Sequence, residues 1–179
     1  MPGRCRVFIA TSLDGFIAGP DDELDWLEVA DDETQGELVD TFTPFFAEVG
    51  AMLMGRRTFD VVTGFDVPWP YGDTPVLVAT HRSLDPSVPT ARPVDGDISE
   101  MVAEAKRVAG GRDVYLDGGE LIREALDADL VDEMTITMVP VVLGAGRPLF
   151  AGVGNRHDLR LVRQRELGRG LVELVYEPR

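Results

Sequence analysis

One short segment of the chain combines a glycine with residues that can bind phosphate. Gly55 ends the apolar run Ala51–Met54 and is followed by Arg56, Arg57 and Thr58. The glycine would let the backbone approach an anion closely, the guanidinium groups could donate paired hydrogen bonds, and the Thr58 hydroxyl could bond the same anion or cap a helix. Taken alone, the segment is explained equally well by a turn glycine followed by solvated arginines.

A second segment makes the same prediction more strongly. Gly118 and Gly119 separate the apolar run Asp113–Asp117 from the helical pattern of Glu120–Ala128. Consecutive glycines between a strand and a helix leave no side chain in the path of a ligand, and a helix N-terminus favours anions. The spacing is not G-x-G-x-x-G, which disfavours a standard dinucleotide-binding fold.

A third polar segment, Thr80, His81 and Arg82, ends another apolar run at 75–79. In an open parallel sheet, the carboxyl ends of the strands share one edge, so these residues are expected to flank the glycine turns. They could contact an adenine or a ribose phosphate. For His81, a simple polar turn remains an equally good explanation.

The residue patterns predict the elements that would position these segments. Apolar runs predict strands over 4–11, 51–54, 75–79, 113–117 and 134–138, and helices are predicted over 58–62, 98–109 and 120–128. A helix beginning at Asp31 or Asp32 is predicted to carry Leu38, Phe42, Phe45, Phe46 and Val49 on one face, with a kink at Pro44. The runs 159–167 and 171–176 predict an antiparallel hairpin. The expected class is α/β with a mainly parallel sheet.

Composition narrows the possible functions. A chain of 179 residues with 44% hydrophobic residues can form one domain over 1–179, and its net charge of −15 disfavours nucleic acid and anionic membranes as partners. We expect a cytoplasmic protein, because no apolar stretch reaches about 18 residues, no signal peptide is evident, and Cys5 is the single cysteine. No cluster of Cys and His suggests a metal site.

Four segments in chain order resemble a known family. They are Ile9–Ala18 (IATSLDGFIA), Met54–Phe59 (MGRRTF), Asp117–Gly119 (DGG) and Leu143–Phe150 (LGAGRPLF). Together they resemble the dihydrofolate reductase superfamily, in the branch that contains the C-terminal reductase domain of bifunctional riboflavin-biosynthesis enzymes. The resemblance covers almost the whole chain and implies a three-layer α/β/α fold with a mixed, mainly parallel sheet and an antiparallel C-terminal hairpin.

The resemblance implies that NADPH is the cofactor. The first strand and the segment after it would contact the nicotinamide, the Gly-Arg-Arg-Thr turn would bind phosphates including the 2′-phosphate, and the two remaining segments would complete the cleft. The cofactor residues implied in this way are Ala10, Ile17, Gly55, Arg56, Arg57, Thr58, Thr80, His81, Arg82, Gly118, Gly119, Glu120, Leu121 and Ile122.

The substrate side is only partly matched. Dihydrofolate reductases carry a Trp five positions before the carboxylate that holds the pterin, and here Trp26 stands five before Asp31, without the Leu-Pro that normally precedes that acid. Asp31, Asp32 and Asp25 are candidate acids and Trp26 a candidate substrate contact, while helix capping and core packing explain the same residues. Phe16 stands where the riboflavin reductases usually place a basic residue, and 35–49 lacks arginine.

These observations predict an NADPH-dependent reductase that transfers hydride to a small pteridine- or pyrimidine-like heterocycle. Three alternatives remain open: dihydrofolate reductase proper, 5-amino-6-(5-phosphoribosylamino)uracil reductase of riboflavin biosynthesis, and a nucleotide-binding module without catalysis. The resemblance also implies homodimerisation through the C-terminal strands, because related reductase domains often pair.

Overall fold

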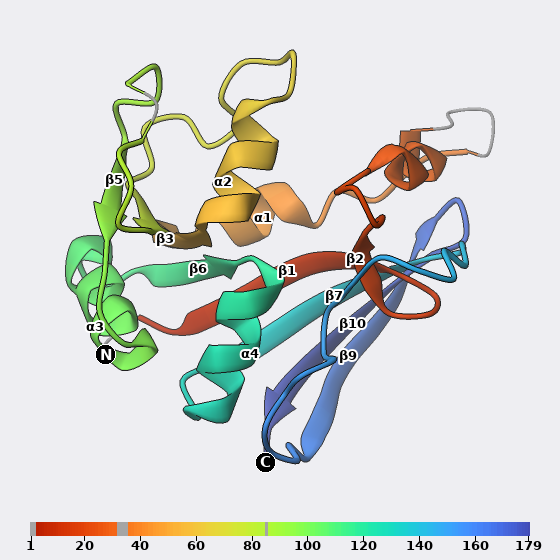
Figure 1. The fold of residues 1–179 in the computed structure, drawn as a ribbon. Helices are drawn as coiled ribbons and strands as arrows, with labels where there is room; N and C mark the ends of the chain where they lie inside the picture. Colours follow the sequence, from red (N-terminus) through yellow and green to blue (C-terminus); the bar gives the residue numbers. More distant parts are fainter. Residues whose placement is uncertain (1–2, 32–35, 85) are drawn as a thin grey trace.

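Eight strands form one twisted sheet in the computed structural model, which describes residues 3–31, 36–84 and 86–179 (Figure 1). The strand order is β5-β4-β3-β6-β1-β7-β10-β9, and every neighbouring pair is parallel except the two pairs that involve β10. The strands are β1 (Cys5–Ser12), β3 (Val49–Gly55), β4 (Val76–Ala79), β5 (Ala91–Val94), β6 (Asp113–Asp117), β7 (Glu133–Val139), β9 (Leu159–Gly168) and β10 (Leu171–Pro178). The predicted mixed sheet with its antiparallel C-terminal hairpin is confirmed.

Helices lie on both faces of the sheet, which gives the three predicted layers (Figure 1). In β3, Ala51 and Leu53 pack against α3 (Ile98–Ala109) and α4 (Gly119–Asp127), whereas Met52 and Met54 pack on the side of α1 (Phe42–Phe46) and α2 (Arg56–Thr63). Side chains alternate across a strand, so a strand that is apolar at every position must be covered on both faces.

The helix predicted over 98–109 is confirmed as α3, and it begins with a capping box. Asp97 accepts a hydrogen bond from the Glu100 backbone N–H at 2.9 Å, and the Glu100 carboxylate accepts one from the Asp97 N–H at 3.2 Å. This reciprocal pair satisfies two backbone donors that the first helical turn leaves free. Gly110, in the left-handed conformation with a φ of 62°, ends the helix.

The helix predicted to start near Asp31 is wrong over most of its length. Asp32 lies outside the described residues, 25–31 forms a 3-10 helix (η1), 36–41 is irregular, and only α1 is α-helical. The Val39 N–H donates to Leu167 O at 2.8 Å, and Arg169 Nε donates to Gly36 O at 2.8 Å. The segment therefore lies along the β9–β10 turn, whose hydrogen bonds replace those of a helix.

Three short strands were not predicted from residue patterns. The edge strand β5 contains Pro93, which an edge tolerates because one side of the strand needs no donor. The strands β2 (Phe16–Ala18) and β8 (Arg147–Pro148) pair with each other and form a separate two-stranded sheet. Each has too few residues to show a periodic pattern.

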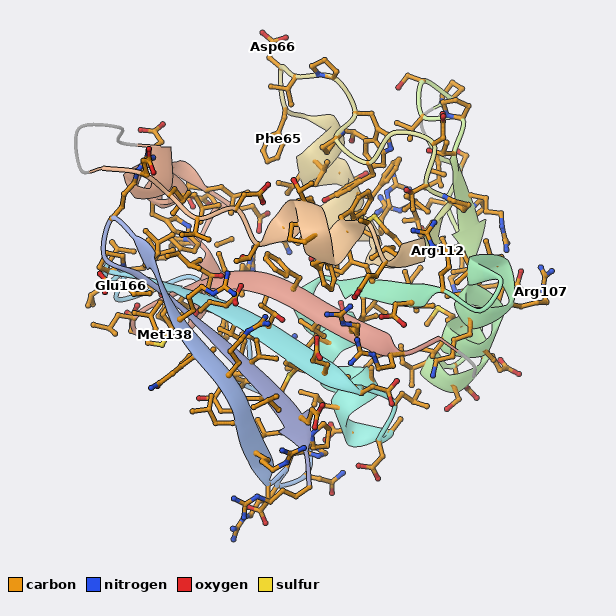
Figure 2. The ribbon with its side chains drawn as sticks, turned by 180° about the vertical axis from the view of Figure 1, so that it is seen from behind. Phe65, Asp66, Arg107, Arg112, Met138 and Glu166 are labelled. Carbon is orange, nitrogen blue, oxygen red and sulfur yellow. The ribbon has the colours of Figure 1, made fainter. Side chains whose placement is uncertain are left out.

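The side of the sheet seen in Figure 2 is unevenly covered. On that side, α1 and α2 lie over the first half of the sheet, and Trp26 of η1 packs against one end of β7, β9 and β10. The rest of these three strands runs across the view with no described helix in front of it. No helix in the described part of the chain is long and apolar enough to cross a bilayer.

Candidate functional site

A cleft of about 1430 Å³ opens at the edge of the sheet where β3, β4 and β6 end. Because these strands are parallel, their carboxyl ends and the helix N-termini that follow them face the same space. Gly55, Ala79 and Asp117 end the three strands, and all three residues line the cleft. The topology of the sheet thus brings the segments 55–58, 80–82 and 118–119 to one cleft, as the sequence predicted.

The double-glycine turn fits closely between two other parts of the site. Gly118 has a φ of 107°, and a Cβ added there would lie 2.7 Å from Thr58 Oγ1. A Cβ on Gly119 would lie 2.8 Å from Ile17 Cδ1. Gly118 has the stronger requirement for glycine, because its positive φ also disfavours a side chain, whereas the clash at Gly119 is with the flexible end of Ile17.

Gly55 differs from these two glycines. Its φ of −67° is accessible to any residue, and an added Cβ would meet only Thr58 Oγ1, at 3.9 Å. The protein itself therefore does not require a glycine here. The open space beside Gly55, at the start of α2, is what the close approach of a ligand phosphate would need.

Four basic residues of the predicted cofactor set, Arg56, Arg57, His81 and Arg82, each lie near a carboxylate. Arg56 Nε lies 2.7 Å from Asp60 Oδ1, and His81 Nδ1 lies 3.4 Å from Asp95 Oδ2. The other arginines of the set make similar pairs, with distances of 2.8 Å for Arg57–Asp22 and 3.9 Å for Arg82–Asp60. Exposed ion pairs of this kind contribute at most about 1 kcal/mol, so the cations remain available to an anionic ligand.

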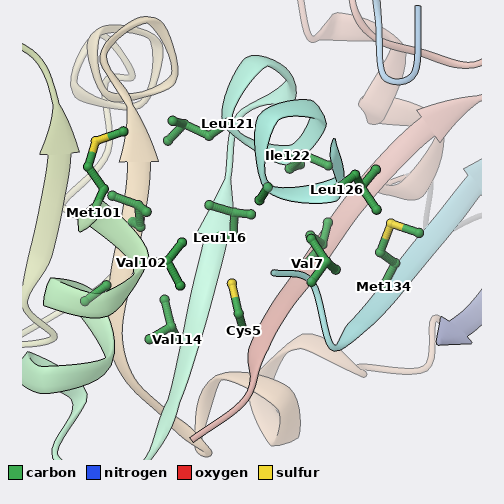
Figure 3. Close-up of a cluster of buried hydrophobic side chains, with 14 of the residues drawn as sticks. Cys5, Val7, Met101, Val102, Val114, Leu116, Leu121, Ile122, Leu126 and Met134 are labelled. Carbon is green, nitrogen blue, oxygen red and sulfur yellow. The ribbon is translucent and has the colours of Figure 1, made fainter. Parts of the chain in front are cut away.

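Thirteen of the fourteen predicted cofactor residues line the cleft: Ala10, Ile17, Gly55, Arg56, Arg57, Thr58, Thr80, His81, Arg82, Gly118, Gly119, Glu120 and Leu121. Ile122 does not. Its side chain is fully buried and lies in the core with Leu116 and Leu126 (Figure 3). Successive side chains along a helix point about 100° apart, so Ile122, one position after the cleft-lining Leu121, points toward the sheet.

The predicted substrate residues are placed less uniformly. Trp26 lines the cleft, is 7% exposed, and donates its indole N–H to Glu23 O at 3.2 Å. Asp25 is exposed and lies outside the cleft lining. The side chain of Asp31 and the whole of Asp32 lie outside the described residues.

Asp117 is an acid that residue patterns did not single out as functional. It ends β6 beside Gly118, and it lines the cleft. Burial raises the pKa of its carboxyl to about 6, although hydrogen bonds from the Gly118 N–H and the Tyr115 hydroxyl oppose the rise. A signal was present in the sequence, because Asp117 stands at the carboxyl end of a buried strand, directly before a glycine turn.

The other end of the cleft is apolar. Its lining comes from η1 and the residue before it, from the last turn of α2 and from the loop beyond α2: Leu24, Trp26, Leu27, Val61, Val62, Phe65 and Tyr71. Figure 2 shows Phe65 at the outer end of α2, away from the sheet. Burial, followed by the charge of Asp117, raises the pKa of the Tyr71 hydroxyl, which places Tyr71 within electrostatic reach of Asp117.

Comparison with protein families matches residues 5–173 to the RibD C-terminal domain. The chain belongs to the RibD C-terminal domain family. The uncharacterized protein YwjB of Bacillus subtilis (strain 168) is 32% identical over 176 residues, which cover 98% of each chain. The expected family is therefore confirmed.

Solved structures agree with this assignment. A Shewanella sp. PV-4 protein, provisionally named a riboflavin biosynthesis protein, superposes with a TM-score of 0.86 at 34% identity, over 98% of this chain and 99% of that one. Dihydrofolate reductase from Enterococcus faecalis, solved with NADP(H), gives a TM-score of 0.61 at 14% identity, over 99% and 98%. The expected dihydrofolate-reductase-like fold is confirmed, and family and fold together are those of a reductase domain.

In this RibD C-terminal domain, a hydrogen-bonded link joins two of the segments that carried the resemblance. The Asp14 carboxylate accepts hydrogen bonds from Ser12 Oγ at 2.7 Å, Gly144 N–H at 2.7 Å and Leu143 N–H at 3.1 Å. The Ser12 contact comes first among the hydrogen bonds that lower the pKa of Asp14. The link holds 143–148 against 12–18, so that β8 lies beside Ile17 at the cleft.

Proposed function

We propose that this protein is an NADPH-dependent reductase that transfers hydride to a small, uncharged heterocycle of the pteridine or pyrimidine type. The observation that carries the proposal is that one cleft contains both cations with glycine turns and an apolar region beside a half-buried acid, Asp117. A dinucleotide phosphate suits the cations and glycine turns, and a flat ring suits the apolar region.

At the cationic end, the residues present fit the phosphates of NADPH. The space beside Gly55 is open, and no side chain of Gly118 or Gly119 stands between a ligand and the turn. Arg56, Arg57 and the α2 N-terminus would hold the phosphates through charged and backbone donors. When bound, NADPH supplies the hydride, and the protein aligns it with the substrate.

At the apolar end, Asp117 is the group we assign to hold the substrate. A carboxyl with a pKa of about 6 changes protonation near neutral pH, so it can accept a hydrogen bond from a ring N–H or deliver a proton to a ring nitrogen. Trp26 and Tyr71 would flank the ring and exclude water from it.

The substrate class follows from the charges at this end. Among the described residues, the lining that η1, the last turn of α2 and Tyr71 contribute contains no Arg or Lys. The riboflavin precursor carries a ribose phosphate, which would need such a cation. We therefore favour a heterocycle without phosphate over the phosphoribosyl pyrimidine.

We also propose that the protein forms a homodimer and is located in the cytoplasm. The part of β9 and β10 beyond the contact with η1, which no described helix covers in Figure 2, would pair with a second copy of the chain. The buried, unpaired Cys5 suits a reducing compartment, and we assign the enzyme to the cytoplasm.

Two measurements test the function. Calorimetric titration with NADPH and NADH should give a preference of at least about tenfold for NADPH; equal or absent binding would refute the cofactor assignment.

A screen of oxidised pteridines and pyrimidines, with and without a ribose phosphate, should then show consumption of NADPH with a phosphate-free ring. Turnover of dihydrofolate or of the phosphoribosyl pyrimidine alone would favour one of the two named reductases, and binding without any turnover would favour a non-catalytic module.

A further inference from the structure

One carboxylate lies between two arginines at the cationic end of the cleft. Asp22 Oδ1 and Oδ2 lie 2.9 and 2.8 Å from Arg57 Nε, and Oδ1 also lies 3.1 Å from Arg147 Nε. All three residues line the cleft. Arg57 belongs to the Gly-Arg-Arg-Thr turn, whereas Arg147 comes from β8 and belongs to none of the cofactor residues that the resemblance implied.

The backbone holds two of these residues, Asp22 and Arg147, in place. In the loop of Asp22, the Asp22 N–H donates to Gly19 O at 3.2 Å and the Gly19 N–H donates to Glu23 O at 2.9 Å. Asp22 has a φ of 68°, which few residues other than glycine, asparagine and aspartate adopt. Arg147 is fixed beside the loop, because β8 pairs with Ala18 of β2.

The arrangement leaves donors unused on both arginines. Within the described residues, each guanidinium contacts Asp22 through Nε, so that its two Nη groups are uncommitted. The side chains of Arg57 and Arg147 are 61% and 42% exposed. Two arginines and one carboxylate carry a net charge of +1 in a protein whose total is −15. An anion bearing two charges would satisfy this pair better than one carboxylate does.

Asp22 is ionised over the physiological pH range. Burial would raise the pKa of its carboxyl, but the hydrogen bonds from Arg57 and Arg147 outweigh that effect and lower the pKa below its ordinary value. The carboxylate therefore competes for the arginines as an anion.

We propose that Asp22 is an exchangeable counter-ion: a phosphate group of the ligand takes the place of its carboxylate between Arg57 and Arg147, which makes Arg147 a phosphate-binding residue. In the free protein, Asp22 keeps the two guanidinium groups together and lowers the affinity of the site for anions. Only the identification of the ligand as NADPH rests on the proposed function, because inorganic pyrophosphate would make the same exchange.

The test compares two neighbouring carboxylates. The variant D22N keeps the size of the side chain and removes its charge, and D22G removes the side chain at a φ that glycine favours. D21N is the matched control, because Asp21 lines the same cleft and makes no ion pair among the described residues. Affinities for inorganic pyrophosphate and for NADPH are measured by calorimetry at one ionic strength, after thermal denaturation has shown that each variant is folded.

We expect D22N and D22G to bind both probes about three- to tenfold more tightly than the natural protein, because the ligand no longer competes with the Asp22 carboxylate for the two arginines. D21N should change the affinity less than twofold. Adding R147Q to D22N should abolish the gain. Unchanged affinity in both Asp22 variants, or an equal gain in D21N, would overturn the exchange, and a double variant that keeps the full gain would overturn the role of Arg147. If no form binds NADPH but the Asp22 variants bind pyrophosphate more tightly, the exchange stands and the proposed function fails.

Discussion

The two ends of the cleft recognise a ligand by different physical means. The cationic end presents backbone and charged donors from the glycine turns, and Arg56, Arg57 and Arg82 already lie near carboxylates. The apolar end presents Trp26, Tyr71 and aliphatic side chains, with the half-buried carboxyl of Asp117 within electrostatic reach of Tyr71. Donor geometry at the first end suits any dinucleotide phosphate, whereas shape and a single acid at the second end select the substrate.

The largest expected effect comes from closing the glycine turn. Gly118→Ala adds a Cβ at a φ of 107° and 2.7 Å from Thr58 Oγ1, so it should displace the Thr58 hydroxyl and weaken NADPH binding by about a hundredfold, equivalent to roughly 3 kcal/mol. Binding by calorimetry and unfolding in urea give the two readouts. Gly144→Ala is the control, because Gly144 has a φ of 77° with nothing within 4 Å, so that this variant carries the backbone strain alone. Equal loss of NADPH binding in both variants would contradict the packing argument.

Asp117 gives a pH-dependent prediction at the apolar end. Its pKa is about 6 in the folded protein and about 3.8 when unfolded, so the folded state holds the proton more tightly. The stability that this proton provides is present below about pH 4 and is lost as the pH rises through about 6. Asp117→Asn should therefore gain on the order of 2 kcal/mol in unfolding free energy relative to the natural protein between pH 4 and pH 7, a figure that allows for partial exposure to the cleft.

Urea unfolding at several pH values measures this difference. A difference that stays constant from pH 4 to pH 7 would show that Asp117 titrates normally. The same variant should bind NADPH with the affinity of the natural protein but lose turnover. This result would assign Asp117 to the substrate end of the cleft and show that cofactor binding does not depend on it.

A smaller effect is expected for a cation of the phosphate end. Arg56→Gln removes one charged donor, so it should weaken NADPH binding about tenfold and NADH binding less, because the 2′-phosphate is the group that distinguishes the two. Arg107→Gln serves as the control, since Arg107 lies on α3, outside the cleft lining, and pairs with Glu104. If Arg56→Gln weakens both cofactors equally, Arg56 binds a phosphate that both share.

The smallest effect concerns the outer part of the apolar end. Phe65 is 43% exposed and lines the cleft, so Phe65→Ala should raise the substrate KM about threefold without a change in NADPH affinity. Phe150→Ala provides a match, because Phe150 is 42% exposed and lies outside the lining. A loss of NADPH affinity in Phe65→Ala would mean that the two ends are not separate.

The sequence by itself determined the features that depend on neighbouring residues. The apolar runs of β3, β4 and β6, the capping box of α3 and the hairpin of β9 and β10 follow from periodicity, capping and turn chemistry, all of which act over a few positions. Parallel strands share one edge, so the convergence of the glycine turns on a single cleft could also be predicted.

Only the tertiary structure decided the features that depend on distant residues. Asp22 meets Arg57 and Arg147 across 35 and 125 positions of the chain. The segment 36–41 follows the β9–β10 turn instead of forming a helix, because hydrogen bonds to Leu167 and from Arg169 replace the helical ones. Ile122 faces the core and Asp117 faces the cleft because the packing of α4 on the sheet sets their directions. Short-range preferences can form an element, but its side chains acquire their partners only when the whole sheet has assembled.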